Sequence, residues 1–197
     1  MTDSAVSLRD AKTRETERAL GAAARRRTIE DGFGGFTIED VCAEVGVSRR
    51  TFINYFASKE NAVLGFAIRT DTHDLDEAFV AGDGPLMEAL VELLISRFER
   101  SGLEPHELGE VMQAAKREPR LIAHAIELMD EAIRGDMRLV ERRQGWPLGD
   151  PRAEVAVKVL GPIVQPTVQQ FFDADASLDF RALARRRLEV ASELFRS

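Results

Sequence analysis

Apolar residues recur at α-helical spacing along most of this 197-residue chain, and runs with the alternating spacing of a β-strand are nearly absent. The segments that carry this pattern are rich in Ala, Leu, Glu and Arg, which are strong helix formers. We therefore predict an all-α fold of about nine helices. Polar caps, Gly and Pro place their starts near residues 7, 37, 48, 58, 85, 104, 119, 152 and 177.

Two of these predicted helices carry further expectations. The fourth is predicted to be long and to extend to about Phe79. The eighth contains Pro162 and Pro166, which are predicted to interrupt or kink it because proline removes a helical hydrogen bond.

Charge is divided unevenly along the chain. Residues 1–62 contain ten Lys or Arg and ten Asp or Glu, so the other 17 basic and 24 acidic groups give the whole net charge, 17 − 24 = −7. No carboxylate lies between Val45 and Lys59, where Arg49 and Arg50 are basic. Because salt screens fields beyond about 8–10 Å, such a local basic surface can bind phosphates on an acidic protein.

Composition argues against several other classes of protein. The single cysteine, Cys42, cannot form an internal disulfide, and His73, His106 and His124 are not spaced as a metal site. No stretch approaches the roughly 18 apolar residues of a membrane span. No nucleophile–base pair or phosphate loop suggests an enzyme. We expect a cytoplasmic protein without metal or cofactor.

A helix, a tight turn and a second helix are predicted between residues 37 and 56. Gly46 lies where the chain must turn, Val47 is expected to fill the space between the helices, and Ser48 caps the second helix. The first helix places four apolar residues on one face: Ile38, Val41, Cys42 and Val45.

The second of these helices has two different faces. Phe52 and Phe56 are four residues apart and are expected to point into the core. The opposite face displays a polar and basic set: Arg49, Arg50, Thr51, Asn54 and Tyr55. Such a helix-turn-helix suits a DNA major groove, which is about 12 Å wide.

Several short motifs repeat a known pattern at fixed spacing: Gly32-Phe33, Thr37-Ile38, Val45-Gly46-Val47-Ser48, Thr51-Phe52, Tyr55-Phe56 and Ser58-Lys59-Glu60. With them, residues 14–65 resemble the amino-terminal domain of TetR-family regulators. The Ser-Arg-Arg-Thr-Phe form at residues 48–52 is similar to a branch common in actinobacterial regulators. Ile53 departs from the pattern, which often has an aromatic residue there.

Eight residues are predicted to bind DNA: Thr37, Ser48, Arg49, Arg50, Thr51, Asn54, Tyr55 and Lys59. Arg49 and Arg50 can read guanine or contact phosphate, and exposed ion pairs with Glu44 or Asp40 are the alternative. The resemblance implies phosphate contacts for Tyr55 and Lys59. For Thr37 the alternative is a helix cap alone, and both roles can hold together. The residues Arg25, Arg26 and Arg27 can reach phosphate or form a solvated face.

The resemblance also implies an effector pocket and a dimer interface in the rest of the chain. Five residues are candidates for the pocket by position: Phe66, Phe98, Met112, His124 and Trp146. The last two helices would form the dimer interface, through Val164, Val168, Phe171, Phe172, Leu188 and Leu194. Ordinary core packing is the alternative for residues of both sets.

The domains are accordingly predicted as residues 7–58 for DNA binding and 59–197 for ligand binding and dimerisation. The expected partners are a double-stranded DNA operator, a second copy of the chain and a small-molecule effector. We expect a repressor that the effector releases from a palindromic operator. A ligand-independent regulator or activator of the same fold is the alternative, and a cavity in the larger domain would discriminate between the two.

Overall fold

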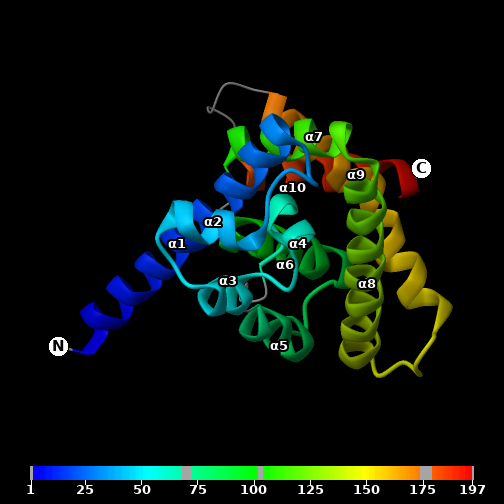
Figure 1. Cartoon of the computed structure of the whole chain (residues 1–197). Helices are drawn as coiled ribbons and strands as arrows, with labels where there is room; N and C mark the ends of the chain where they lie inside the picture. The colour runs from blue at the N-terminus through cyan, green and yellow to red at the C-terminus, as the bar shows by residue number, and fades with distance from the viewer. Residues whose placement is uncertain (1, 68–71, 102–103, 174–178, 197) are drawn as a thin grey trace. The chain divides into compact units, whose positions relative to one another are not determined.

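The computed structural model describes residues 2–67, 72–101, 104–173 and 179–196, and every regular element in these ranges is an α-helix (Figure 1). The predicted all-α fold is confirmed. The helices are α1 (Thr2–Asp31), α2 (Ile38–Val45), α3 (Arg49–Tyr55), α4 (Lys59–Leu64), α5 (His73–Ala81), α6 (Leu86–Ser101), α7 (Pro105–Arg117), α8 (Pro119–Gln144), α9 (Pro151–Asp173) and α10 (Phe180–Arg196).

The predicted fourth helix is in fact two helices, which is why these ranges contain ten helices and not about nine. α4 ends at Leu64, and Gly65 adopts a left-handed conformation with φ of 77°. The N–H of Phe66 then donates to the carbonyl of Asn61 at 2.9 Å, closing the Schellman pattern that ends many helices. The apolar spacing continues past this glycine, so the sequence pattern alone did not reveal the break.

α9 is one continuous helix, which corrects the prediction that its prolines interrupt it. Pro162 and Pro166 both lie inside the helix, four residues apart. Their rings therefore share one helical face, and the other face keeps its hydrogen-bonding pattern. Beside them the hydroxyl of Thr167, which is fully buried, donates to the carbonyl of Ile163 at 3.0 Å.

The chain forms two compact units, and the first consists of residues 1–70 and 107–125. In this unit α1 packs against α2 and α4, and α2 packs against α3. Its core contains fully or nearly fully buried residues from several helices: Leu20, Ala24, Phe33, Phe36, Val41, Phe52, Phe56, Val63, Ala114 and Leu121. This unit positions the predicted DNA-binding residues.

The second unit consists of residues 71–106 and 126–197. Here α10 packs against α6 and α9, and α6 also packs against α5 and α9. The core includes an aromatic cluster in which Phe98 stacks on Phe180, with ring centroids 4.1 Å apart, while Phe171 contacts both rings edge-on. Arg97 is held among these helices by Asp76 at 2.7 Å and Asp136 at 2.6 Å.

The described ranges contain neither a helix suited to span a membrane nor a cluster of metal-binding side chains. No helix there combines the length and the apolar character needed to cross a membrane. No group of three or more His, Cys, Asp or Glu side chains there is arranged to hold a metal ion.

Candidate nucleic-acid interface

α2 begins at a reciprocal cap made by Thr37 and Asp40. The backbone N–H of Asp40 donates to the Thr37 hydroxyl at 3.2 Å, and the backbone N–H of Thr37 donates to the Asp40 carboxylate at 2.8 Å. The Thr37 hydroxyl also donates to that carboxylate at 2.7 Å. These hydrogen bonds hold the pKa of Asp40 below its usual range. Thr37 is therefore a helix cap, and its predicted phosphate contact would add to that role.

The turn after α2 has the geometry expected from its glycine. Gly46 has φ of 75°, in the left-handed region that favours glycine. The N–H of Val47 donates to the carbonyl of Cys42 at 3.0 Å, and the Val47 side chain is half-buried. Cys42 is buried, and burial raises the pKa of its thiol, so it is a core residue and not a thiolate.

α3 is held in the unit by its inner face. Ser48 caps the helix by accepting from the N–H of Thr51 at 3.0 Å, and its hydroxyl lies 2.8 Å from that of Thr51. Phe52 and Phe56 are buried with ring centroids 5.7 Å apart, which confirms their predicted core role. The helix is therefore fixed through these two rings and its cap.

The outer face of α3 consists mostly of exposed side chains. Arg49, Arg50, Ile53 and Asn54 are exposed, and Thr51 and Tyr55 are half-buried. Arg49 pairs with Glu39 at 2.8 Å, and both side chains are 63% exposed. The expected alternative partners were Glu44 and Asp40, but Glu44 pairs instead with Arg26 and Arg27. An exposed ion pair contributes only about 0–1 kcal/mol, so Arg49 can exchange Glu39 for DNA at little cost.

Lys59 makes internal contacts at the start of α4. Its ammonium donates to the carbonyls of Phe33 and Phe36 at 2.6 and 2.7 Å, and it lies 4.2 and 4.0 Å from the centroids of their rings. Burial lowers the pKa of Lys59, and nearby Arg120 lowers it further. The ammonium thus closes the loop before α2, and direct phosphate contact by Lys59 stays a prediction.

Arg25 has a role that the sequence reasoning missed. Its side chain is 2% exposed, and it binds Glu107 and Glu110 of α7, each at 2.9 Å. It therefore cannot contribute to a solvated face or to a phosphate contact. Its neighbours Leu20, Ala24 and Thr28 are buried, and the apolar Leu20 and Ala24 are a signal that this arginine lies on the buried side of α1. The hydroxyl of Thr28 donates to the carbonyl of Ala24 at 2.8 Å.

Three of the predicted pocket residues belong to the first unit and two to the second. Phe98 belongs to the aromatic cluster of the second unit, and Trp146 stacks with Arg152, whose guanidinium carbon lies 4.2 Å from the indole centroid. Phe66 and Met112 are exposed, at 41% and 52%. The imidazole Nε2 of His124 lies 2.8 Å from the Asn61 amide oxygen. Their role in binding an effector stays a prediction.

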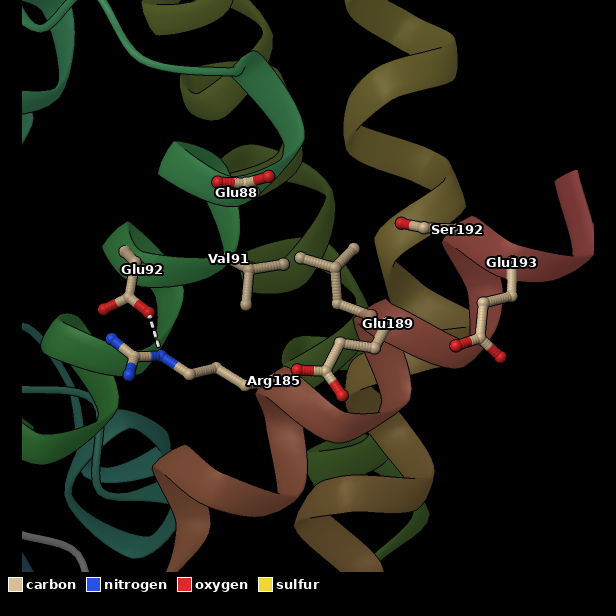
Figure 2. A pocket seen from close by; sticks show the side chains of 8 residues that line it. Glu88, Val91, Glu92, Arg185, Glu189, Ser192 and Glu193 are labelled. Carbon is tan, nitrogen blue, oxygen red and sulfur yellow. Dashed lines mark hydrogen bonds and ion pairs between the residues drawn. The ribbon is translucent and has the colours of Figure 1, made fainter. Parts of the chain in front are cut away.

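A pocket of about 540 Å³ instead lies between α6 and α10 in the second unit. Figure 2 shows α6 side chains on one side facing α10 side chains on the other, with Arg185 joined to Glu92. That hydrogen bond is 2.7 Å long and holds the pKa of Glu92 below its usual range. The pocket combines apolar, acidic and hydroxyl groups: Glu88, Val91, Glu92, Arg185, Leu188, Glu189, Ser192 and Glu193.

The predicted dimer residues divide into three groups. Leu194 is 70% exposed and, with Val155, lines an apolar groove of about 600 Å³ between α9 and α10. Val164, Phe171 and Leu188 are partly buried against the core of their own unit. The side chains of Val168 and Phe172 lie outside the described residues. Among the candidates whose side chains are described, Leu194 is the most exposed, and the dimer interface stays a prediction.

The fold and the interface together define a DNA-binding regulator with a helix-turn-helix: a capped helix, a tight glycine turn and a second helix with a polar outer face. Residues 20–63 match the family described as bacterial regulatory proteins, tetR family. The chain is 30% identical over 193 residues to the HTH-type transcriptional regulator TcmR of Streptomyces glaucescens, a match that covers 90% of this chain and 82% of that protein. The chain therefore belongs to the TetR family of transcriptional regulators.

Proposed function

We propose that this DNA-binding regulator is a dimeric repressor that reads a palindromic operator through α3 and is released by a small-molecule effector. The proposed role of α3 in reading the operator rests on the division of this helix into a buried aromatic face and an exposed polar face. Two copies would place two such helices on half-sites about 34–36 Å apart, which is one turn of DNA.

A pocket supports effector release over ligand-independent regulation. The α6–α10 pocket has about 540 Å³, within the range of about 300–1,000 Å³ that small-molecule sites occupy. Release further requires that the effector bind the two states of the regulator with different affinity. The proposed domains remain a DNA-binding part at residues 7–58 and a ligand-binding and dimerisation part at residues 59–197.

The reading role is tested with Arg49→Ala and Tyr55→Phe. The probe is a duplex that the unmodified protein selects from a pool of random sequences. We expect both variants to bind this duplex more weakly, and Arg49→Ala also to relax base preference by about 1–3 kcal/mol at one position. Arg138→Ala, an exposed arginine of α8, is the charge-matched control. Undiminished binding by both variants would remove α3 from the reading role.

Effector release is tested on the same complex. Small molecules that raise the thermal unfolding temperature of the free protein are titrated into the protein–duplex complex. We expect at least one of them to release the duplex. If molecules that bind the second unit never weaken DNA binding, the ligand-independent alternative replaces this proposal.

A further inference from the structure

The loop between α1 and α2 needs contacts from outside itself to hold one shape. It contains Gly32, Gly34 and Gly35, and glycine loses more conformational freedom on ordering than any other residue. A Cβ at Gly35 would lie 2.4 Å from the carbonyl oxygen of Asp31, so the loop is tightly closed and its glycine cannot be replaced by a larger residue. The loop leads directly into the Thr37 cap of α2.

The first of these contacts comes from α4. Lys59 joins the carbonyls of Phe33 and Phe36, whose buried rings meet edge-on with centroids 6.2 Å apart. Because Lys59 belongs to the same sequence motif as α3, this contact is local to the helix-turn-helix part of the chain.

The second contact comes from the junction of α7 and α8, about 85 residues further along the chain. Glu118, between the two helices, accepts the backbone N–H of Phe33 at 3.0 Å. The guanidinium carbon of Arg120 lies 3.9 Å from the centroid of the Phe33 ring, and its Nε lies 3.6 Å from Glu118. Leu121, which is fully buried, anchors the junction in the core.

We propose that Glu118 and Arg120 are positioning residues for DNA binding, which hold the loop before α2 in the shape that presents α2 and α3 to DNA. They act on the loop through Phe33, and their charges also reach Lys59 of the predicted DNA-binding set. The proposal goes beyond the proposed function and does not depend on an effector.

The exposure of the two side chains separates this role from core stability. Glu118 is 24% exposed and Arg120 is 53% exposed, so truncating either opens no cavity in the core. Truncating Glu118 removes the acceptor of the Phe33 N–H, and truncating Arg120 removes the cation over the Phe33 ring. The loop then samples more conformations, and DNA binding must order it again.

The test compares Glu118→Ala with Glu118→Gln, which keeps an oxygen acceptor for the Phe33 N–H. Arg120→Ala is compared with Arg117→Ala, which removes the same charge from an exposed position at the end of α7. Binding is measured to the duplex selected by the unmodified protein, together with the thermal unfolding temperature and the hydrogen-exchange rate of the Phe33 amide.

We expect Glu118→Ala and Arg120→Ala to bind the duplex about three- to tenfold more weakly at an unchanged unfolding temperature. The Phe33 amide should exchange faster in Glu118→Ala. Glu118→Gln and Arg117→Ala should bind within about twofold of the unmodified protein. The proposal is overturned if Glu118→Ala binds as tightly as Glu118→Gln, or if Arg117→Ala weakens binding as much as Arg120→Ala. If Glu118→Ala lowers the unfolding temperature, the comparison of Arg120→Ala with Arg117→Ala tests the proposal in its place.

Discussion

Arg25 gives the sharpest prediction about stability, because its guanidinium is enclosed between α1 and α7. Its side chain is 2% exposed, and that of Glu107 is 9% exposed. Gly21 leaves room for the group, since a Cβ there would lie 3.1 Å from an Arg25 Nη atom. Replacing Arg25 with Met keeps much of the aliphatic stem and removes the charge, so the buried Glu107 carboxylate loses its ion pair with the guanidinium.

The magnitude follows from which of the two ion pairs is buried. Removing one partner of a buried pair costs about 3–5 kcal/mol, because the remaining charge is uncompensated. Glu110 is 41% exposed, so its contact with Arg25 adds no more than about 1 kcal/mol. For a chain of this size, a loss of 3 kcal/mol lowers the unfolding temperature by about 6–12 °C.

Urea and thermal unfolding of Arg25→Met measure this loss, at one fixed protein concentration because the proposed dimerisation would make stability depend on concentration. Arg26→Met is the matched control, since this neighbouring arginine is 51% exposed and pairs with Glu44. We expect the control to lose less than about 1 kcal/mol. Combining Arg25→Met with Glu107→Leu should recover most of the stability.

Two results would refute this reasoning. One is an Arg25→Met variant no less stable than Arg26→Met, which would mean that the guanidinium contributes no more than a surface group. The other is a double variant no more stable than Arg25→Met alone, which would mean that the loss comes from the shape of the side chain and not from the broken ion pair with Glu107.

Two further predictions concern the second unit. Hydrogen bonds from Arg152 hold the pKa of Asp150 at about 2, so an NMR titration should show that midpoint and Arg152→Ala should move it up towards 3.8. Because the folded-state pKa is depressed, the stabilising contribution is present above the ordinary pKa and is lost as the pH falls towards 2; an unmoved midpoint in Arg152→Ala would contradict this cause. Leu194→Glu should weaken the proposed dimer in sedimentation equilibrium without unfolding the chain. The control is Leu148→Glu, at a leucine that is 82% exposed, and it should leave dimerisation unchanged. Equal dimerisation by both variants would exclude Leu194 from the interface.

The helix-turn-helix could be predicted because its determinants are local. Ser48 and Thr37 form side-chain caps within three residues, Gly46 determines the turn, and the spacing of Phe52 and Phe56 identifies the inner face. Each of these features depends only on neighbouring residues, so the sequence shows it directly. The same reasoning predicted a helix start near residue 119, where α8 begins.

Features that depend on distant parts of the chain could not be predicted in this way. Arg25 lies in a run of three arginines, and only the packing of α7 shows that one of them is buried. The roles of Lys59 and Phe33 depend on carbonyls and side chains that lie far away in the sequence. The α6–α10 pocket likewise depends on how α10 packs, which apolar spacing does not specify.

The two prolines of α9 change the hydrogen bonding of the backbone beside its exposed apolar groove. Proline has no N–H, so the carbonyls of Lys158 and Pro162 receive no helical donor from the residues four positions later. Water can satisfy them while the surface is open, but a covering surface that lacks donors would leave each acceptor unsatisfied at a cost of about 1–3 kcal/mol. An apolar partner that covers the groove should therefore bind more tightly if it also brings hydrogen-bond donors to these two carbonyls.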